Sequence, residues 1–258
     1  KMGLKIGFIG CGTHATRSLY PSLRLVPQIE LEAVVDLKEE LARRNADWFR
    51  AERWYTNHLE MLEKEKDLNA VMICVNAETH PKLVKDCLNS GLHVFVEKPA
   101  AKTPQQSREL SNKSARTGRF VMVGYMKRFA PTYLKAKEIT ERAGFGRVTM
   151  VDGRWSTGAY PSAFTFLMEA AIHQINLVRM FGGEVRRLHA EKSEPVKGHA
   201  AFALSLLFKG GSVGSVSMCS TEGSGYAERV EIAGDQTYVV VENLRRIFYY
   251  PRDKPSQF

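Results

Sequence analysis

The chain has 258 residues, of which 44% are hydrophobic and 25% are charged, proportions that exclude disordered and fibrous classes. The formal net charge is +9, but Lys and Arg are scattered among acidic residues without a basic run. The preferred interpretation of this charge is therefore a set of solvated helix faces, and the second is an attraction for anionic small molecules. We expect no nucleic-acid partner. No apolar run approaches the roughly 20 residues that a membrane span needs, so we expect no membrane partner.

Apolar runs and helix-period segments alternate through the first half. The predicted strands lie at 5–9, 31–35, 53–55, 70–75, 93–96 and 120–123, and the predicted helices at 15–25, 38–50, 59–64, 80–90 and 104–117. Strands that are apolar throughout are typical of a parallel sheet covered on both faces. The pattern predicts an α/β, doubly wound Rossmann domain, which we place at residues 1–124.

The second half has a different order of elements. A helix near 131–142, a strand at 147–155 and a helix at 166–181 precede strands at 185–192, 200–208, 212–219, 227–233, 237–241 and 246–250. Successive strands without helices between them predict a mostly antiparallel open sheet. We therefore expect an α+β domain over residues 125–258.

Apolar residues alternate along two strands of this second sheet. They are Phe202, Leu204, Leu206 and Phe208 on one strand, and Val213, Val216 and Met218 on the next. One helix layer covers only part of such a surface, so the pattern predicts a homodimer or homotetramer through the C-terminal sheet. The alternative is a sheet covered entirely within its own chain.

The four cysteines form no CxxC pair and no metal-ligand spacing. We therefore expect no metal site, and reduced thiols in a cytoplasmic protein.

The segment from Gly10 to Ala15 has the pattern G-x-G-x-x-A, follows the first strand and opens the first helix. Gly10 permits a tight turn, Gly12 lets the backbone approach a pyrophosphate, and Ala15 allows close packing of helix on strand. The helix N-terminus, with Thr13 and His14, would then face the phosphates. The alternative, an ordinary glycine-rich turn, does not need this strand-to-helix context.

Asp36 ends the second strand, where an acidic residue binds the adenosine ribose hydroxyls in this fold. A carboxylate there repels a 2′-phosphate, which favours NAD over NADP. A solvated aspartate at the strand end is the alternative. Lys38, Arg43 and Arg44 lie nearby and keep NADP open as the cofactor.

Further segments carry a family resemblance. They are Val94-Phe95-Val96-Glu97-Lys98-Pro99, the run from Gly124 to Pro131, the run from Met168 to Asn176, and the passage from Cys74 to His80. Together with the glycine pattern, they resemble the glucose–fructose oxidoreductase / inositol dehydrogenase (Gfo/Idh/MocA) family from about Leu4 to Tyr250.

The resemblance implies a cleft between the two domains in which a sugar, polyol or related hydroxyl compound is oxidised, or its carbonyl reduced, with NAD(P). The catalytic residues implied are Lys98, Glu169 and His173. Asn76, His80, Glu97 and Lys98 would lie beside the cofactor, and Tyr125 and Arg128 would contact the substrate. An NAD-retaining glycosidase that uses transient oxidation, and a non-catalytic nucleotide-binding regulator, are the alternatives.

Glu169 and His173 are spaced four residues apart, which places both on one face of the predicted helix at about 5–6 Å between their Cβ atoms. A carboxylate there would stabilise the charged imidazole of a histidine that acts as acid and base. Their apolar neighbours predict that both are buried, whereas spacing alone also fits a surface pair.

The sequence departs from the family at Glu169 and Asn176, where Asp is common, and at Met126, where Asn is common. The chain is also shorter than family members, so we expect either a cut C-terminus or missing segments.

Overall fold

The computed structural model describes residues 3–223 and 227–252, and the chain divides into two compact units, residues 1–124 and 125–258. Residues 253–258, which the predicted second domain includes, lie outside the described ranges.

The first unit is a parallel six-stranded sheet in the order β3-β2-β1-β4-β5-β6, which confirms the predicted doubly wound fold. The strands are β1 (Leu4–Ile9), β2 (Ile29–Val35), β3 (Arg53–Tyr55), β4 (Ala70–Ile73), β5 (His93–Val96) and β6 (Val121–Val123). The helices are η1 (Ala15–Leu19), α1 (Tyr20–Leu23), α2 (Glu39–Phe49), α3 (His58–Lys64), α4 (His80–Asn89) and α5 (Pro104–Thr117).

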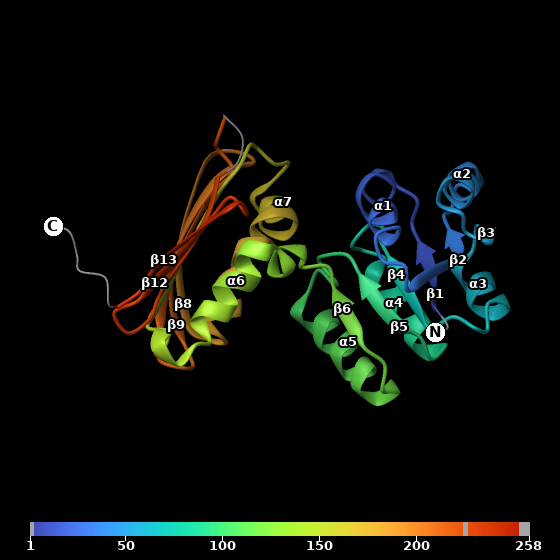
Figure 1. Cartoon of the computed structure of the whole chain (residues 1–258). Coiled ribbons are helices and arrows are strands. Elements are labelled where there is room, and N and C mark those ends of the chain that lie inside the picture. Colours follow the sequence, from blue (N-terminus) through green and yellow to red (C-terminus); the bar gives the residue numbers. More distant parts are fainter. Residues whose placement is uncertain (1–2, 224–226, 253–258) are drawn as a thin grey trace. The chain divides into compact units, whose positions relative to one another are not determined.

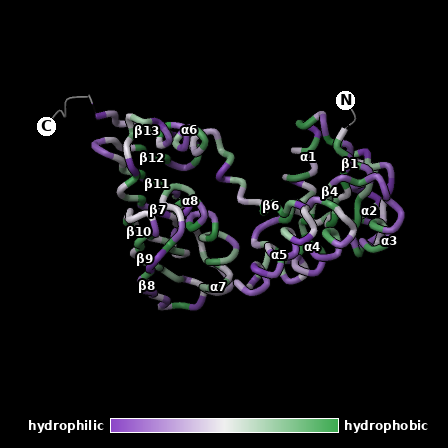
Figure 2. The backbone as a smooth tube through the Cα atoms, turned by 90° about the horizontal axis from the view of Figure 1, so that it is seen from below, coloured by the Kyte–Doolittle hydropathy of each residue, from purple (hydrophilic) through white to green (hydrophobic). Residues whose placement is uncertain are grey.

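Helices cover both faces of this sheet (Figure 1). Phe8 and Val34 face η1, α1 and α2, whereas Ile9, Val35 and Ile73 face α3, α4 and α5. The alternation of side chains along a strand explains why neighbouring residues serve opposite cores. Figure 2 shows β1 and β4 as hydrophobic backbone and α5 as largely hydrophilic, as expected for central strands and a surface helix.

The second unit is a seven-stranded sheet in the order β13-β12-β11-β7-β10-β9-β8. Its strands are β7 (Met150–Ser156), β8 (Val185–Val196), β9 (His199–Phe208), β10 (Val213–Cys219), β11 (Ala227–Ala233), β12 (Tyr238–Glu242) and β13 (Arg246–Tyr250). Neighbouring strands are antiparallel except β7 and β10, which pair in parallel. The predicted mostly antiparallel sheet is confirmed.

Helices pack on one face of the second sheet (Figure 1). They are η2 (Met126–Phe129), α6 (Pro131–Thr140), η3 (Ala143–Phe145), α7 (Ala163–Phe166), η4 (Leu167–Ala171) and α8 (Ile172–Gly182). Phe166, Leu177 and Val178 form a core with Phe208 and Val216 of the sheet.

The apolar strand residues that suggested an uncovered surface belong to this core. Leu206, Phe208, Val216 and Met218 are buried, and Phe202 and Leu204 pack against them. Val213 is half exposed. Except at Val213, the expectation that one helix layer leaves these residues uncovered is therefore wrong, because the side chains of α8 and its neighbours already fill that face.

Candidate active site

The glycine-rich loop after β1 has the geometry that its pattern predicts. Gly10 has φ +110°, and a Cβ on it would lie 2.1 Å from the Cys74 carbonyl oxygen, so only glycine fits. A Cβ on Gly12 would meet no protein atom within 4 Å. The packing around Gly10 therefore excludes any larger residue, whereas Gly12 leaves open space beside the backbone. Ala15 is fully buried under the loop.

The Asp36 carboxylate anchors this loop to the end of β2. One of its oxygens accepts a hydrogen bond from the Cys11 N–H at 2.8 Å, and the other accepts one from the Lys38 N–H at 2.9 Å. A carboxylate offers about four acceptor positions, so this orientation leaves capacity for further donors.

The ends of β4 and β5 bring the Cys74 and Glu97–Lys98 segments beside the loop. Glu97 is buried, accepts a hydrogen bond from the Lys98 N–H at 3.0 Å, and lies 3.7 Å from His14 Nε2. Burial, with the Glu97 charge adding to it, raises the pKa of the Cys74 thiol to about 12. Cys74 is therefore a neutral, unreactive wall residue.

All the predicted cofactor residues except His80 line one cavity of about 460 Å³ at the carboxyl edge of the first sheet. They are Gly10, Gly12, Thr13, His14, Asp36, Asn76, Glu97 and Lys98, and Ala15, Cys74 and Val75 complete the wall. The carboxyl edge is where open parallel sheets bind ligands.

His80 lies elsewhere. It is the first residue of α4, is only 1% exposed, and is not among the residues lining the cavity. Its Nδ1 forms a hydrogen bond with the Pro99 carbonyl oxygen at 2.8 Å. The structure thus joins His80 to the segment that carries Lys98.

Glu169 and His173 lie in the second unit, on the helical stretch that packs on the sheet. His173 is in the first turn of α8 and is buried, at 7% exposure. Glu169 belongs to η4, a turn of π-helix, and is exposed. Its predicted burial is wrong because Ala170 and Ala171 occupy the core side of that turn. Such π-helical turns are frequent at functional sites.

Tyr125 is the N-cap residue of η2 in the same unit, and Arg128 lies within η2. Arg128 Nη1 donates a hydrogen bond to Asn176 Oδ1 on α8 at 3.3 Å, which places its guanidinium one helical turn beyond His173. Burial raises the pKa of the Tyr125 hydroxyl, and the nearby Arg128 and Arg179 oppose the shift. Tyr125, Arg128 and the helix carrying His173 therefore belong to one neighbourhood.

Lys127, which sequence reasoning did not select, anchors this neighbourhood. It is 4% exposed, pairs with the buried Glu228 of β11, and has its Nζ 3.4 Å from the centre of the Trp155 ring. The Tyr133 hydroxyl donates to the other Glu228 oxygen at 2.8 Å. In the sequence, only the position of Lys127 between the predicted site residues Tyr125 and Arg128 could have pointed to it as a site residue.

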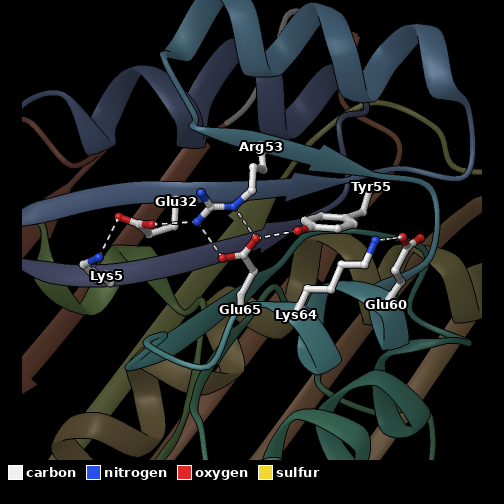
Figure 3. A network of polar contacts seen from close by, with 7 residues as sticks. All are labelled: Lys5, Glu32, Arg53, Tyr55, Glu60, Lys64 and Glu65. Carbon is white, nitrogen blue, oxygen red and sulfur yellow. Dashed lines mark hydrogen bonds and ion pairs between the residues drawn. The ribbon is translucent and has the colours of Figure 1, made fainter.

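A second polar cluster lies between β1, β2, β3 and α3 (Figure 3). Arg53 donates to Glu65 and, at 3.0 Å, to Glu32, while Lys5 lies 3.3 Å from Glu32. The Tyr55 hydroxyl also donates to Glu65. These charges pair with one another around a hollow of about 560 Å³, so the cluster joins the end of α3 to the sheet.

In the described part of the chain, no helix is long and apolar enough to cross a membrane. The described residues also contain no group of three or more His, Cys, Asp or Glu side chains arranged to hold a metal ion.

Comparisons with known proteins agree with this geometry. The model of an oxidoreductase family with an NAD-binding Rossmann fold matches residues 4–125, and the GFO/IDH/MocA C-terminal domain matches residues 133–240. Myo-inositol 2-dehydrogenase of Thermotoga maritima is 25% identical over 94% of this chain and 76% of its own length. Inositol 2-dehydrogenase of Salmonella typhimurium is 29% identical over 69% of this chain.

The chain spans 54% of the Salmonella relative. Among solved structures, a dehydrogenase from Chromobacterium violaceum has a TM-score of 0.92 at 22% identity, covering 100% of this chain and 77% of that one. This likeness extends the agreement in fold to both units.

Two adjoining family models thus cover most of the chain, and the cavity of the first unit is lined by Asn76, Glu97 and Lys98, three of the residues that the family resemblance singles out. The chain belongs to the GFO/IDH/MocA family of oxidoreductases, whose N-terminal domain is an NAD-binding Rossmann fold.

Proposed function

We propose that the protein is an NAD-dependent dehydrogenase that transfers a hydride between the nicotinamide and the CH–OH carbon of a sugar or polyol. The cavity at the carboxyl edge of the first sheet carries the proposal, since it contains the glycine-rich loop, Asp36 and Lys98 together. Bound NAD supplies the hydride acceptor.

The residues of the cavity fit a dinucleotide. The open space beside Gly12 admits a pyrophosphate close to the backbone. Asp36, oriented by two backbone N–H groups, accepts hydrogen bonds from the ribose hydroxyls. Its negative charge disfavours the 2′-phosphate of NADP.

Oxidation of an alcohol also requires a base for the hydroxyl proton. We assign this role to His173, because imidazole is the side chain best suited to accept and return a proton near neutral pH. Glu169, four residues earlier, stabilises the imidazolium, and Lys98 donates a hydrogen bond to the reacting oxygen. Tyr125 and Arg128 hold the other hydroxyls of the substrate; the Arg128–Asn176 bond supports this by fixing the guanidinium beside α8.

The names of the relatives point to cyclic polyols as first candidates. The test mixes purified protein and NAD with a panel of inositols, aldoses and alditols and follows absorbance near 340 nm. We expect NADH to accumulate with at least one polyol. Retention of NAD through purification, with cleavage of a glycoside and no net NADH, would instead support the glycosidase alternative. Binding of NAD without turnover of any compound would support a regulator.

We also propose that the protein self-associates through the face of the second sheet that the helices leave open. This face has a hollow of about 700 Å³, and its polar side chains include Asp152, Arg154, Ser215, Arg229 and Glu231. Such a face fits an interface made by charge pairing rather than by apolar burial.

A further inference from the structure

Two contacts join the segment after β4 to the segment after β5. His80 Nδ1 bonds to the Pro99 carbonyl oxygen in the interior, at 2.8 Å. At the surface, Lys102 pairs with the Glu78 carboxylate and lowers its pKa. The two contacts connect the same pair of segments, but only the first is buried, and only the first adjoins Lys98.

The buried contact has a defined direction. A carbonyl oxygen only accepts, so the proton of the His80 ring resides on Nδ1. The other ring nitrogen, Nε2, is buried and has no hydrogen-bond partner among the described residues. The bond to Pro99 is therefore a buried hydrogen bond that orients this ring through its Nδ1 atom.

The same contact restrains the backbone on one side of Lys98. On the other side, the Lys98 N–H donates to the Glu97 carboxylate at 3.0 Å. We propose that His80 is a positioning residue: through the Pro99 carbonyl it fixes the backbone that presents the Lys98 amine to the cavity. This role rests on the proposed function and replaces the direct cofactor contact that the family resemblance implied.

Two amide variants separate the roles, because each places a nitrogen where the imidazole has one. The Asn side chain puts its nitrogen at the Nδ1 position and still reaches Pro99, whereas Gln puts its nitrogen near the Nε2 position. We expect His80→Asn to keep kcat within about fivefold of wild type. We expect His80→Gln and His80→Leu to lose about 10–100-fold in kcat, the usual effect of misplacing a reacting group by about 1 Å.

A double-mutant cycle asks whether the effect passes through Lys98. In the Lys98→Ala background, His80→Leu is expected to change kcat by less than about twofold, since no amine remains to be misplaced. Lys102→Gln, which removes the exposed contact between the same segments, is the matched control and should leave kcat and NAD affinity unchanged. Thermal unfolding of each variant separates loss of fold from loss of position.

A readout that needs no substrate accompanies the kinetics. Acylation of Lys98 by an amine-directed reagent, followed by peptide mass spectrometry, should have the same rate in wild type and His80→Asn. The rate of Lys98 acylation should change at least threefold in His80→Gln and His80→Leu. The acylation rate of Lys82 in the same samples is the internal reference.

Equal rates of Lys98 acylation in wild type, His80→Gln and His80→Leu would overturn the proposal. So would an NAD affinity that is normal in His80→Gln but reduced in His80→Asn. If no polyol is turned over, the proposed function fails, while the acylation comparison still decides the role of His80.

Discussion

Asp36 shows how one carboxylate serves both the fold and the ligand. It accepts two backbone N–H groups, which shapes the glycine-rich loop, and it lines the cavity of the first unit. A substitution at this residue should therefore change cofactor preference rather than abolish the fold.

We expect Asp36→Ser to weaken NAD binding by about 10–100-fold, the value of one or two lost charge-assisted hydrogen bonds. NADP binding should improve, because the carboxylate that repels the 2′-phosphate is gone while the cations Lys38 and Arg43 remain nearby. Titration of both cofactors by fluorescence measures the ratio. Asp47→Ser, at an exposed carboxylate on α2, should not change it. Tighter binding of NADP than NAD by the wild type would contradict the assignment.

His173 is the second residue whose role can be isolated. His173→Ala should lower kcat by about 10²–10⁴-fold, the usual contribution of general acid–base catalysis. NAD affinity should stay the same, because the residues lining the cavity come from the first unit. His189→Ala, at an exposed histidine on β8, is the control. Near-normal turnover without His173 would transfer the role of base to Lys98.

At the scale of elements, the Arg53–Glu65 contact joins β3 to the end of α3 (Figure 3). The hydrogen bond from Arg53 lowers the pKa of Glu65 and outweighs the opposing effect of burial. A carboxylate with a depressed folded-state pKa stabilises the protein above its unfolded pKa, and this stabilisation is lost as the pH falls through the folded value.

We therefore expect Glu65→Gln to reduce the free energy of unfolding near pH 7 by about 1–2 kcal/mol, a moderate value because Arg53 is half exposed. The deficit should shrink as the pH is lowered from 7 through the depressed folded-state pKa of Glu65, because the wild-type carboxyl then becomes neutral as well. Denaturant unfolding at pH 7 and at an acidic pH below that folded-state pKa measures both quantities. Glu60→Gln breaks only the exposed pair with Lys64 and should cost less than about 0.5 kcal/mol. An equal deficit at both pH values would contradict the electrostatic explanation.

Much of the element order was predictable because local signals end most helices and strands. The helix α5 has its predicted bounds, with Thr103 as the N-cap and Gly118 in the left-handed conformation at its end. The strand β7 begins three residues later than expected, at Met150, where pairing with β10 and β11 starts. Pairing of this kind depends on residues far along the chain, which local patterns do not contain.

The same distinction applies to the candidate site. Motifs placed within single strand-to-helix turns predicted the residues of the cavity, because each turn has a fixed geometry. The buried partners of His80 and Lys127 were not predicted, since Pro99 and Glu228 lie 19 and 101 residues away. The wider turn at Glu169 was also missed, because no residue type marks a π-helical turn reliably.

At the scale of the whole molecule, the open face of the second sheet leads to a prediction about assembly. Its polar residues predict an oligomer that light scattering detects at micromolar concentration in about 0.1 M salt and that weakens in about 1 M salt, where charges are screened within about 3 Å.

Arg154→Glu should dissociate this oligomer, because the exposed guanidinium lies in the hollow of that face. Arg116→Glu, at an exposed position on α5 of the first unit, is the matched charge reversal and should have no effect. A wild-type monomer under both salt conditions would rule out the proposed assembly.

The contact between Lys127 and Glu228 also has a consequence for biosynthesis. The cavity of the first unit is lined by residues no later than Lys98, whereas Lys127 must wait for a partner 101 residues further along the chain. At ribosomal rates of about 5–20 residues per second, that wait lasts roughly 5–20 s. Over this interval Lys127 lacks its carboxylate partner, so we expect the segment that carries Tyr125 and Arg128 to be fixed in place only after all the residues that line the cavity of the first unit have been synthesised.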